Sequence, residues 1–295
     1  MLAAVCATLT NACLKKYQGA AGRGFIAASV FLFLSSALAL PVLLAVCLFD
    51  GGNVSVEAGD LWLPFLYAVL YILTFFLTMS AVRLGSLTVY MVYISAGMIF
   101  IPLLYGVIFL KEELNLIKGI CIVLSAVTCF IPLAGGKEEK AEKRGKKRYY
   151  GICILAMAAN AMTIVLSKMR EVYCPGFSPE NYTFYSKAAV ALCSGLAFPA
   201  FFARRESRTR LRECVKPRAC LPIFAGAAFG IGNILFLNIS AAKLPVSVQS
   251  PLFSGFVLIS TAAADKWIFR EKISLNTLAC LVLSVVTAVL FAFTV

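Results

Sequence analysis

The sequence predicts an all-α integral membrane protein with about ten transmembrane helices in two inverted five-helix repeats. Its composition is the first observation. The chain of 295 residues is 61% hydrophobic and only 14% charged, whereas soluble domains average about 45–50% apolar and about 25% charged residues. A soluble core does not absorb that much apolar surface, so part of the solvent must be lipid.

Long apolar runs are the second observation, and they place the helices in order. The runs cover 25–49, 61–82, 86–110, 119–134, 151–167, 182–203, 219–242, 246–268 and 273–295. Most approach the roughly 20 residues that cross a bilayer core. They are continuous and do not alternate, which predicts helices and excludes a barrel. The first 14 residues are also apolar but too short to span comfortably, so we expect a short first helix.

An internal echo is the third observation. "LKEELNLIKGICIVLSAVT" (110–128) aligns with "FREKISLNTLACLVLSVVT" (269–287) without a gap, 159 residues later. "LALPVLLA" (38–45) resembles "LAFPAFFA" (196–203), and "TNACL" resembles "ANAMT", which matches Asn11 to Asn160. The order is the same in both copies, so a duplication is the best explanation. The predicted repeats are residues 1–134 and 151–295, joined by a charged linker at 135–150 that we expect to be disordered.

The basic residues predict the orientation in the membrane. On a ten-helix count, 21 of the 27 Lys and Arg fall in alternate loops, which marks the cytoplasmic side. The linker 135–150 and the loop 204–218 are therefore predicted to be cytoplasmic, in a multi-pass protein of the cell membrane. The loop that corresponds to 204–218 in the first half, 49–60, carries no Lys or Arg, so the halves are inverted. The net charge of +13 reflects these anchors, and we expect no nucleic-acid partner.

Several kinds of chemistry have no residues to support them. The chain contains no His, and its 11 Cys show no C-x-x-C motif or metal-ligand spacing. Ser/His and Cys/His nucleophile arrangements and His metal motifs are thereby excluded. We expect no enzyme activity, no metal and no cofactor.

The two halves resemble the drug/metabolite transporter superfamily, in particular its EamA-type ten-helix members. The resemblance covers nearly the whole chain and depends on the repeat, the short turns "AVRLGSLTV" and "AAKLPVSV", and charged turns containing Glu112 and Glu271. Gly119 matches the family pattern after Glu112, but Leu278 stands where the second half would carry Gly. The resemblance implies transport of a small-molecule substrate by alternating access. It also implies a substrate cavity lined largely by the third, fourth, eighth and ninth helices, and assigns the two Glu to structural turns.

Polar residues within the apolar runs are the candidates for substrate binding, because polar groups are costly in a membrane. The uncharged candidates are Asn11, Tyr71, Tyr90, Tyr93, Ser95, Asn160, Asn233, Gln249 and Ser254. The spacing of Tyr90 and Tyr93 keeps both on one helix face. For each of these residues, a hydrogen bond that holds two helices together is an equal alternative.

Two charged residues complete the candidate set. Lys187 either snorkels to the outer interface, five residues past an expected helix start, or contacts an anion of the substrate. Asp265 either forms an interfacial ion pair or serves as a proton-coupling carboxylate. The lipid bilayer and a small-molecule substrate are the expected partners, and a homodimer is left open. The alternatives to a transporter are a membrane scaffold or lipid-handling protein and, less favoured, a membrane-embedded enzyme.

Overall fold

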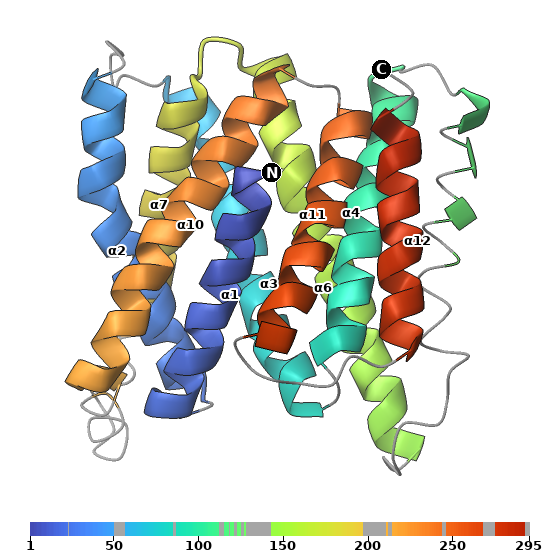
Figure 1. Ribbon diagram of the computed structural model, residues 1–295. Helices are drawn as coiled ribbons and strands as arrows, with labels where there is room; N and C mark the ends of the chain where they lie inside the picture. The colour runs from blue at the N-terminus through green and yellow to red at the C-terminus, as the bar shows by residue number, and fades with distance from the viewer. Residues whose placement is uncertain are drawn as a thin grey trace. The chain divides into compact units, whose positions relative to one another are not determined.

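A computed structural model gives the architecture of residues 1–22, 24–49, 57–84, 87–111, 143–196, 214–243, 246–267 and 275–292, with Leu211 and a few positions between 115 and 127. All the regular secondary structure of these residues is helical (Figure 1). The elements are α1 (Leu2–Ala21), α2 (Phe25–Phe49), η1 (Ala58–Leu61), α3 (Trp62–Leu84), α4 (Leu87–Phe109), α6 (Lys143–Tyr173), α7 (Pro179–Gly195), α10 (Pro217–Lys243), α11 (Val246–Trp267) and α12 (Leu275–Ala292).

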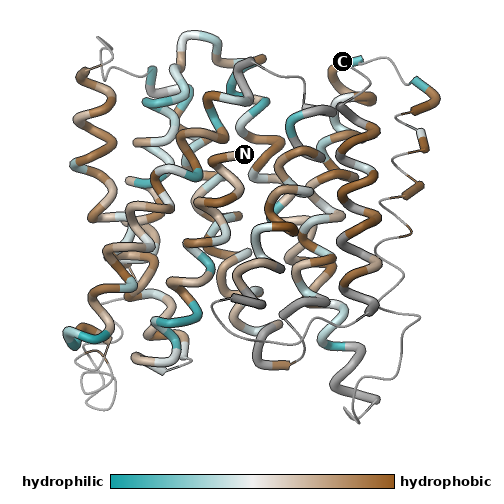
Figure 2. Tube along the Cα trace, viewed as in Figure 1, coloured by the Kyte–Doolittle hydropathy of each residue, from teal (hydrophilic) through white to brown (hydrophobic). Residues whose placement is uncertain are grey.

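The helices follow the predicted apolar runs closely, and the protein is of the all-α membrane type. Five segments within the described residues are long and apolar enough to cross a membrane: Phe25–Phe49, Gly59–Ala81, Tyr90–Phe109, Arg148–Tyr173 and Pro217–Ser240. Hydrophobic residues run along most of α2 and α12 (Figure 2). The predicted helix at 119–134 lies almost entirely outside the described residues, so the count of ten stays a prediction.

The chain forms two compact units that interleave in sequence. The first unit contains Leu77–Lys168 and Lys243–Val295, together with Met1, and the second contains Leu2–Phe76 and Met169–Ala242. Each unit therefore draws on both predicted halves. The boundaries fall within α3 and within α6, so these two helices each contribute to both units.

The first helix is longer than the sequence led us to expect. α1 has 20 residues because it continues through Lys15 and Lys16 to Ala21. Gly22 then adopts a left-handed backbone with φ of 87°, and its N–H donates to the Gln18 carbonyl at 3.1 Å. A glycine in this conformation is a common helix terminator, which explains where α1 ends.

The linker between the halves is partly ordered. Helix α6 begins at Lys143, so residues 143–150 of the expected disordered linker are helical, and residues 135–142 lie outside the description. Lys and Arg are good helix formers, and the apolar run that follows continues the same helix. The expectation of disorder was wrong for 143–150 because it weighed charge above helix propensity.

Helix α4 forms the centre of the first unit. Every residue from Tyr90 to Ile99 is buried, and a helix buried on all sides must be surrounded by others. α11 and α12 both contact α4. The end of α3 and the first part of α6 pack against it around Tyr90, Met98 and Cys153.

The second unit is built on the packing of α2 against α7. Ala39 and Leu43 of α2 form a core with Ile231 of α10, against which Phe184 of α7 also packs. α10 approaches α2 closely at Gly226, where an added Cβ would lie 2.8 Å from Cζ of Phe31. Helices without bulky side chains at such contacts can pack closely in a membrane.

The contact between α4 and α6 makes a first prediction. A Cβ at Gly97 would overlap Cγ of Met157 and lie 3.1 Å from its carbonyl oxygen. We expect Gly97→Ala to cost about 1–3 kcal/mol by overpacking, measured as a lower unfolding temperature in detergent. Gly151→Ala on α6 is the matched control, because a Cβ there meets nothing within 4 Å. An unfolding temperature for Gly97→Ala at or above that of the control would contradict this packing.

Candidate functional site

The candidate site of the second unit begins at the turn between α6 and α7, which is held by backbone hydrogen bonds and a helix cap. The Cys174 N–H donates to the Arg170 carbonyl at 2.9 Å, and the Phe177 N–H donates to the Cys174 carbonyl at 2.9 Å across Pro175 and Gly176. Ser178 then caps α7 by accepting from the Asn181 N–H at 3.2 Å. Pro179 occupies the first helical position, as is common at helix starts.

Lys187 lies at the middle of α7 and is only 5% exposed. It is the ninth of 17 helical residues, so about 12 Å of helix separates it from either end. The snorkelling prediction assumed a helix start near residue 182, and α7 begins three residues earlier, at Pro179. The Lys187 Nζ lies 4.9 Å from the centroid of the Tyr71 ring, within the range of a cation–π contact. Within the described residues, Lys187 has no ion pair.

Aromatic rings connect Tyr71 to the α6–α7 turn. Tyr71 stacks on Tyr67 with ring centroids 5.7 Å apart, and Tyr67 meets Tyr182 edge-on at 6.1 Å. Tyr182 in turn meets Phe177 edge-on at 5.8 Å. These four rings, from α3, α7 and the turn, form one continuous series, which we call the aromatic ladder.

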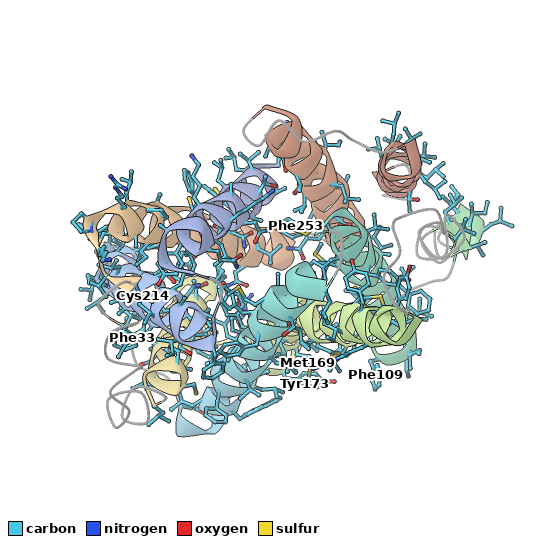
Figure 3. The ribbon with its side chains drawn as sticks, turned by 90° about the horizontal axis from the view of Figure 1, so that it is seen from below. Phe33, Phe109, Met169, Tyr173, Cys214 and Phe253 are labelled. Carbon is cyan, nitrogen blue, oxygen red and sulfur yellow. The ribbon has the colours of Figure 1, made fainter. Side chains whose placement is uncertain are left out.

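Arg170 lies next to Phe177, at the end of the aromatic ladder away from Tyr71. It was not among the candidate residues predicted from the sequence. It is 3% exposed, and its Nη1 donates to the Phe177 carbonyl at 2.8 Å. The predicted apolar run ends at 167, so Arg170 lies beyond it in the sequence. The signal was present in the helical period, since Ala159, Leu166 and Arg170 continue one buried stripe of α6. Met169 and Tyr173 mark the last turns of α6 in Figure 3.

Further buried polar groups lie on the same face of α7. Thr183 donates to the Pro179 carbonyl at 2.7 Å and accepts from Nδ2 of Asn238 on α10 at 2.5 Å. Ser194 likewise bonds to carbonyls of its own helix. The buried Ser186 hydroxyl, one residue before Lys187, has no such hydrogen bond. One buried face of α7 is therefore polar, and its Ser186 hydroxyl is a hydrogen-bond donor that no backbone carbonyl of α7 accepts from.

The candidates of the first unit lie within packed helices. Tyr90 and Tyr93 belong to one buried cluster, as their spacing predicted. The Tyr90 hydroxyl shares a hydrogen bond with Thr78 at 2.5 Å, and the Tyr93 ring lies 6.2 Å from that of Tyr150.

Two predicted candidates meet directly across α4 and α11 in this unit. Ser254 is fully buried, and its Oγ donates to the Ser95 carbonyl at 2.8 Å. Gln249 is also buried, five residues earlier on α11. The contacts of Ser95 and Ser254 are those of helix packing.

The remaining candidates are dispersed. Asn11 is exposed on α1, and Asn160 is half-buried on α6, where its carbonyl accepts from Thr163 at 2.6 Å. Asn233 is half-buried on α10, and its Oδ1 has no hydrogen-bond partner among the described residues. The backbone of Asp265 belongs to α11, but its side chain lies outside the description, as do Glu112 and Glu271. The described residues hold no cluster of His, Cys, Asp and Glu suited to a metal.

Cys174 in the α6–α7 turn gives a prediction on pH. Burial, together with a hydrogen bond to Asp60 and its negative charge, raises the pKa of Cys174 to about 11. Asp60→Asn removes the negative charge and should lower the pKa of Cys174. At pH 8–9 we expect maleimide to label Cys174 several-fold and up to about tenfold faster, because the thiolate fraction rises tenfold for each unit by which the pKa falls. Peptide mass spectrometry measures the rate, with Cys220 as the internal control, and an unchanged or slower rate would refute the coupling.

Comparison with known proteins supports the fold alone. No protein-family profile matches the chain, and no curated protein matches it. Among solved structures, a chain described only as "Crystal structure of protein" matches at 15% sequence identity and a TM-score of 0.65. The match covers 98% of this chain and 95% of that chain. The helical architecture is therefore shared with a known structure over nearly its full length.

Proposed function

We propose that this protein is a secondary transporter of the drug/metabolite type, which moves a small metabolite across the cell membrane by alternating access between inverted halves. In this proposal the linker 135–150 and the loop 204–218 face the cytoplasm. Labelling of cysteines introduced there, by an impermeant reagent on intact cells, would be slow. The five apolar helices support a membrane location.

The observation that carries the proposal is the contact between Ser95 and Ser254. These residues are 159 positions apart, which is the offset at which the two halves align in sequence. A two-fold relation between repeats brings equivalent residues together where they approach the axis. A hydrogen bond between equivalent serines is what such an axis would produce.

A second pair of helices supports the same relation. α2 contains the segment 38–45, α7 ends directly before its match at 196–203, and the two helices pack against each other in the second unit. The first unit has the equivalent pair α4 and α11, also in contact. Each compact unit thus contains one pair of repeat-related helices. Inverted repeats of this kind are common in secondary transporters, where substrate sites lie near the bilayer midplane.

The buried polar residues distinguish this proposal from its rivals. Lys187 lies midway along a helix, a depth at which ionisable residues usually mark a solute or ion pathway. A scaffold needs no such group. A membrane-embedded enzyme would need a nucleophile with its base, and the absence of His from the sequence removes the commonest base.

Reconstitution into liposomes tests the proposal. A thermal-shift screen of small metabolites first identifies solutes that stabilise the purified protein, since a bound ligand raises stability by mass action. We expect at least one such solute to show saturable counterflow that protein-free and heat-inactivated liposomes lack. A protein that binds a partner tightly but moves no stabilising solute under any gradient would instead be a scaffold.

Asp265 is the proposed proton-coupling residue, because it is the only acid well inside an apolar run. We expect Asp265→Asn to abolish uptake driven by a pH gradient while solute counterflow continues, because exchange of solute for solute needs no proton. The measurement is initial uptake rate with and without an imposed gradient. Gradient-driven uptake with an unchanged pH dependence in the variant would end the coupling hypothesis.

A further inference from the structure

The guanidinium of Arg170 presents one edge without a hydrogen-bond partner. Its Nη1 bonds to the Phe177 carbonyl, whereas Nε and Nη2 are buried and have no partner among the described residues. The N–H groups of Nε and Nη2 lie side by side on the planar group. This is the fork that binds two oxygens of a carboxylate or a phosphate at once.

The acids near Arg170 do not fill this edge. Glu171 and Glu180 act electrostatically on the guanidinium, but neither is hydrogen-bonded to Nε or Nη2. Glu180 belongs to the first turn of α7, where a negative charge is already favoured by the helix dipole. No carboxylate of the described residues therefore occupies the Nε and Nη2 fork, whose geometry suits two oxygens of one group.

Lys187 is a second buried cation in the same unit, and the aromatic ladder connects it to the Arg170 turn. Tyr182 interacts electrostatically with Arg170 and belongs to the aromatic ladder, whose Tyr71 ring contacts Lys187. Tyr182 and Lys187 are five residues apart on α7, which is about 7.5 Å along the axis. Arg170 lies near the end of α6 and Lys187 midway along α7, and the aromatic ladder lies between them.

The described helices of the unit carry no acid midway along their length. Within its described helices, Asp and Glu occur only in end turns, and none lies within α1, α2, α10 or the part of α3 that belongs to the unit. A buried cation is retained only when a counter-charge or a functional need compensates for its desolvation. For Lys187 the described helices supply no such counter-charge, and for Arg170 they leave the Nε and Nη2 edge without a hydrogen bond.

We propose that the second unit binds the carboxylate or phosphate group of a small solute, first through the Nε and Nη2 fork of Arg170 and then through Lys187. This inference rests on the proposed function and names its substrate class as organic or inorganic anions. Because the Arg170 fork is buried, the turn at 174–178 must move aside for the solute to reach it. Ser186, with its unused hydroxyl beside Lys187, supplies a further donor.

The test is thermal unfolding of the full chain in nanodiscs of zwitterionic lipid, titrated with sodium succinate, sodium phosphate or sodium chloride at matched ionic strength. We expect saturable stabilisation by succinate or phosphate beyond that of chloride. Arg170→Lys keeps the charge but removes the fork, and should weaken the apparent affinity about tenfold or more. Lys187→Met should weaken the apparent affinity to a similar degree. It is the variant to measure if Arg170→Lys does not fold.

Two control variants separate this site from general charge effects. Lys168→Met removes a half-buried cation two residues before Arg170, and should leave the affinity unchanged. Glu180→Gln should leave it unchanged or increase it, because the variant removes a competing carboxylate near the fork.

Several results would overturn the inference. One is the absence of any saturable shift above chloride, and another is an equal shift in wild type and in both Arg170→Lys and Lys187→Met. Stabilisation that appears only when anionic lipid is added would make this a headgroup site. A loss of stability in Glu180→Gln equal to that in Arg170→Lys, without anion effects, would identify an internal ion pair. Anion binding without transport would refute the proposed function alone, whereas unaltered transport of uncharged solutes in Arg170→Lys would refute only the inference.

Discussion

Two positive charges are buried in one helical unit without a hydrogen-bonded counter-ion among its described residues, and the other features of the structure are interpreted from this constraint. Arg170 and Lys187 are both at least nine-tenths buried, and a charge at the centre of a membrane helix costs about 2.5–3.5 kcal/mol even by insertion scales. The protein offsets part of that cost with a turn carbonyl for Arg170 and a tyrosine face for Lys187. Glu171 and Glu180 act on Arg170 electrostatically but leave its Nε and Nη2 unbonded, and Lys187 has no ion pair among the described residues, so both groups are suited to an anion.

The packing around these charges explains how they are held. α7 is fixed at its start by Ser178 and Pro179, along its length by α2, and at Thr183 by Asn238 of α10. These contacts hold the α7 backbone, and therefore the Cα of Lys187, in place. The same turn that caps α7 accepts the hydrogen bond of Arg170, so its position depends on the α6–α7 connection. Arg170 can both hold this turn and bind a ligand, because Nη1 bonds to the turn while Nε and Nη2 remain for the ligand.

The sequence was sufficient to predict the helices, because runs of apolar residues as long as 25–49 or 246–268 have few alternatives in a chain of this composition. It also predicted that Tyr90 and Tyr93 share one cluster, since helical spacing fixes a common face. It failed at α1 and at 143–150, where basic residues ended the apolar pattern but did not end the helix. Arg170 was missed for the same reason. The aromatic ladder could not have been predicted, because Tyr67, Tyr182 and Phe177 meet only through the packing of α3 on α7.

The most direct test of the central claim is electrical, because an anion that enters a site at mid-membrane depth displaces charge. Proteoliposomes adsorbed on a solid-supported membrane report such displacement as a transient current when succinate or phosphate is rapidly added. The account predicts a saturable transient with the sign of inward-moving negative charge, which Lys187→Met reduces strongly and Lys168→Met does not. A transient of the same size in wild type and Lys187→Met, or none with either anion, would contradict it.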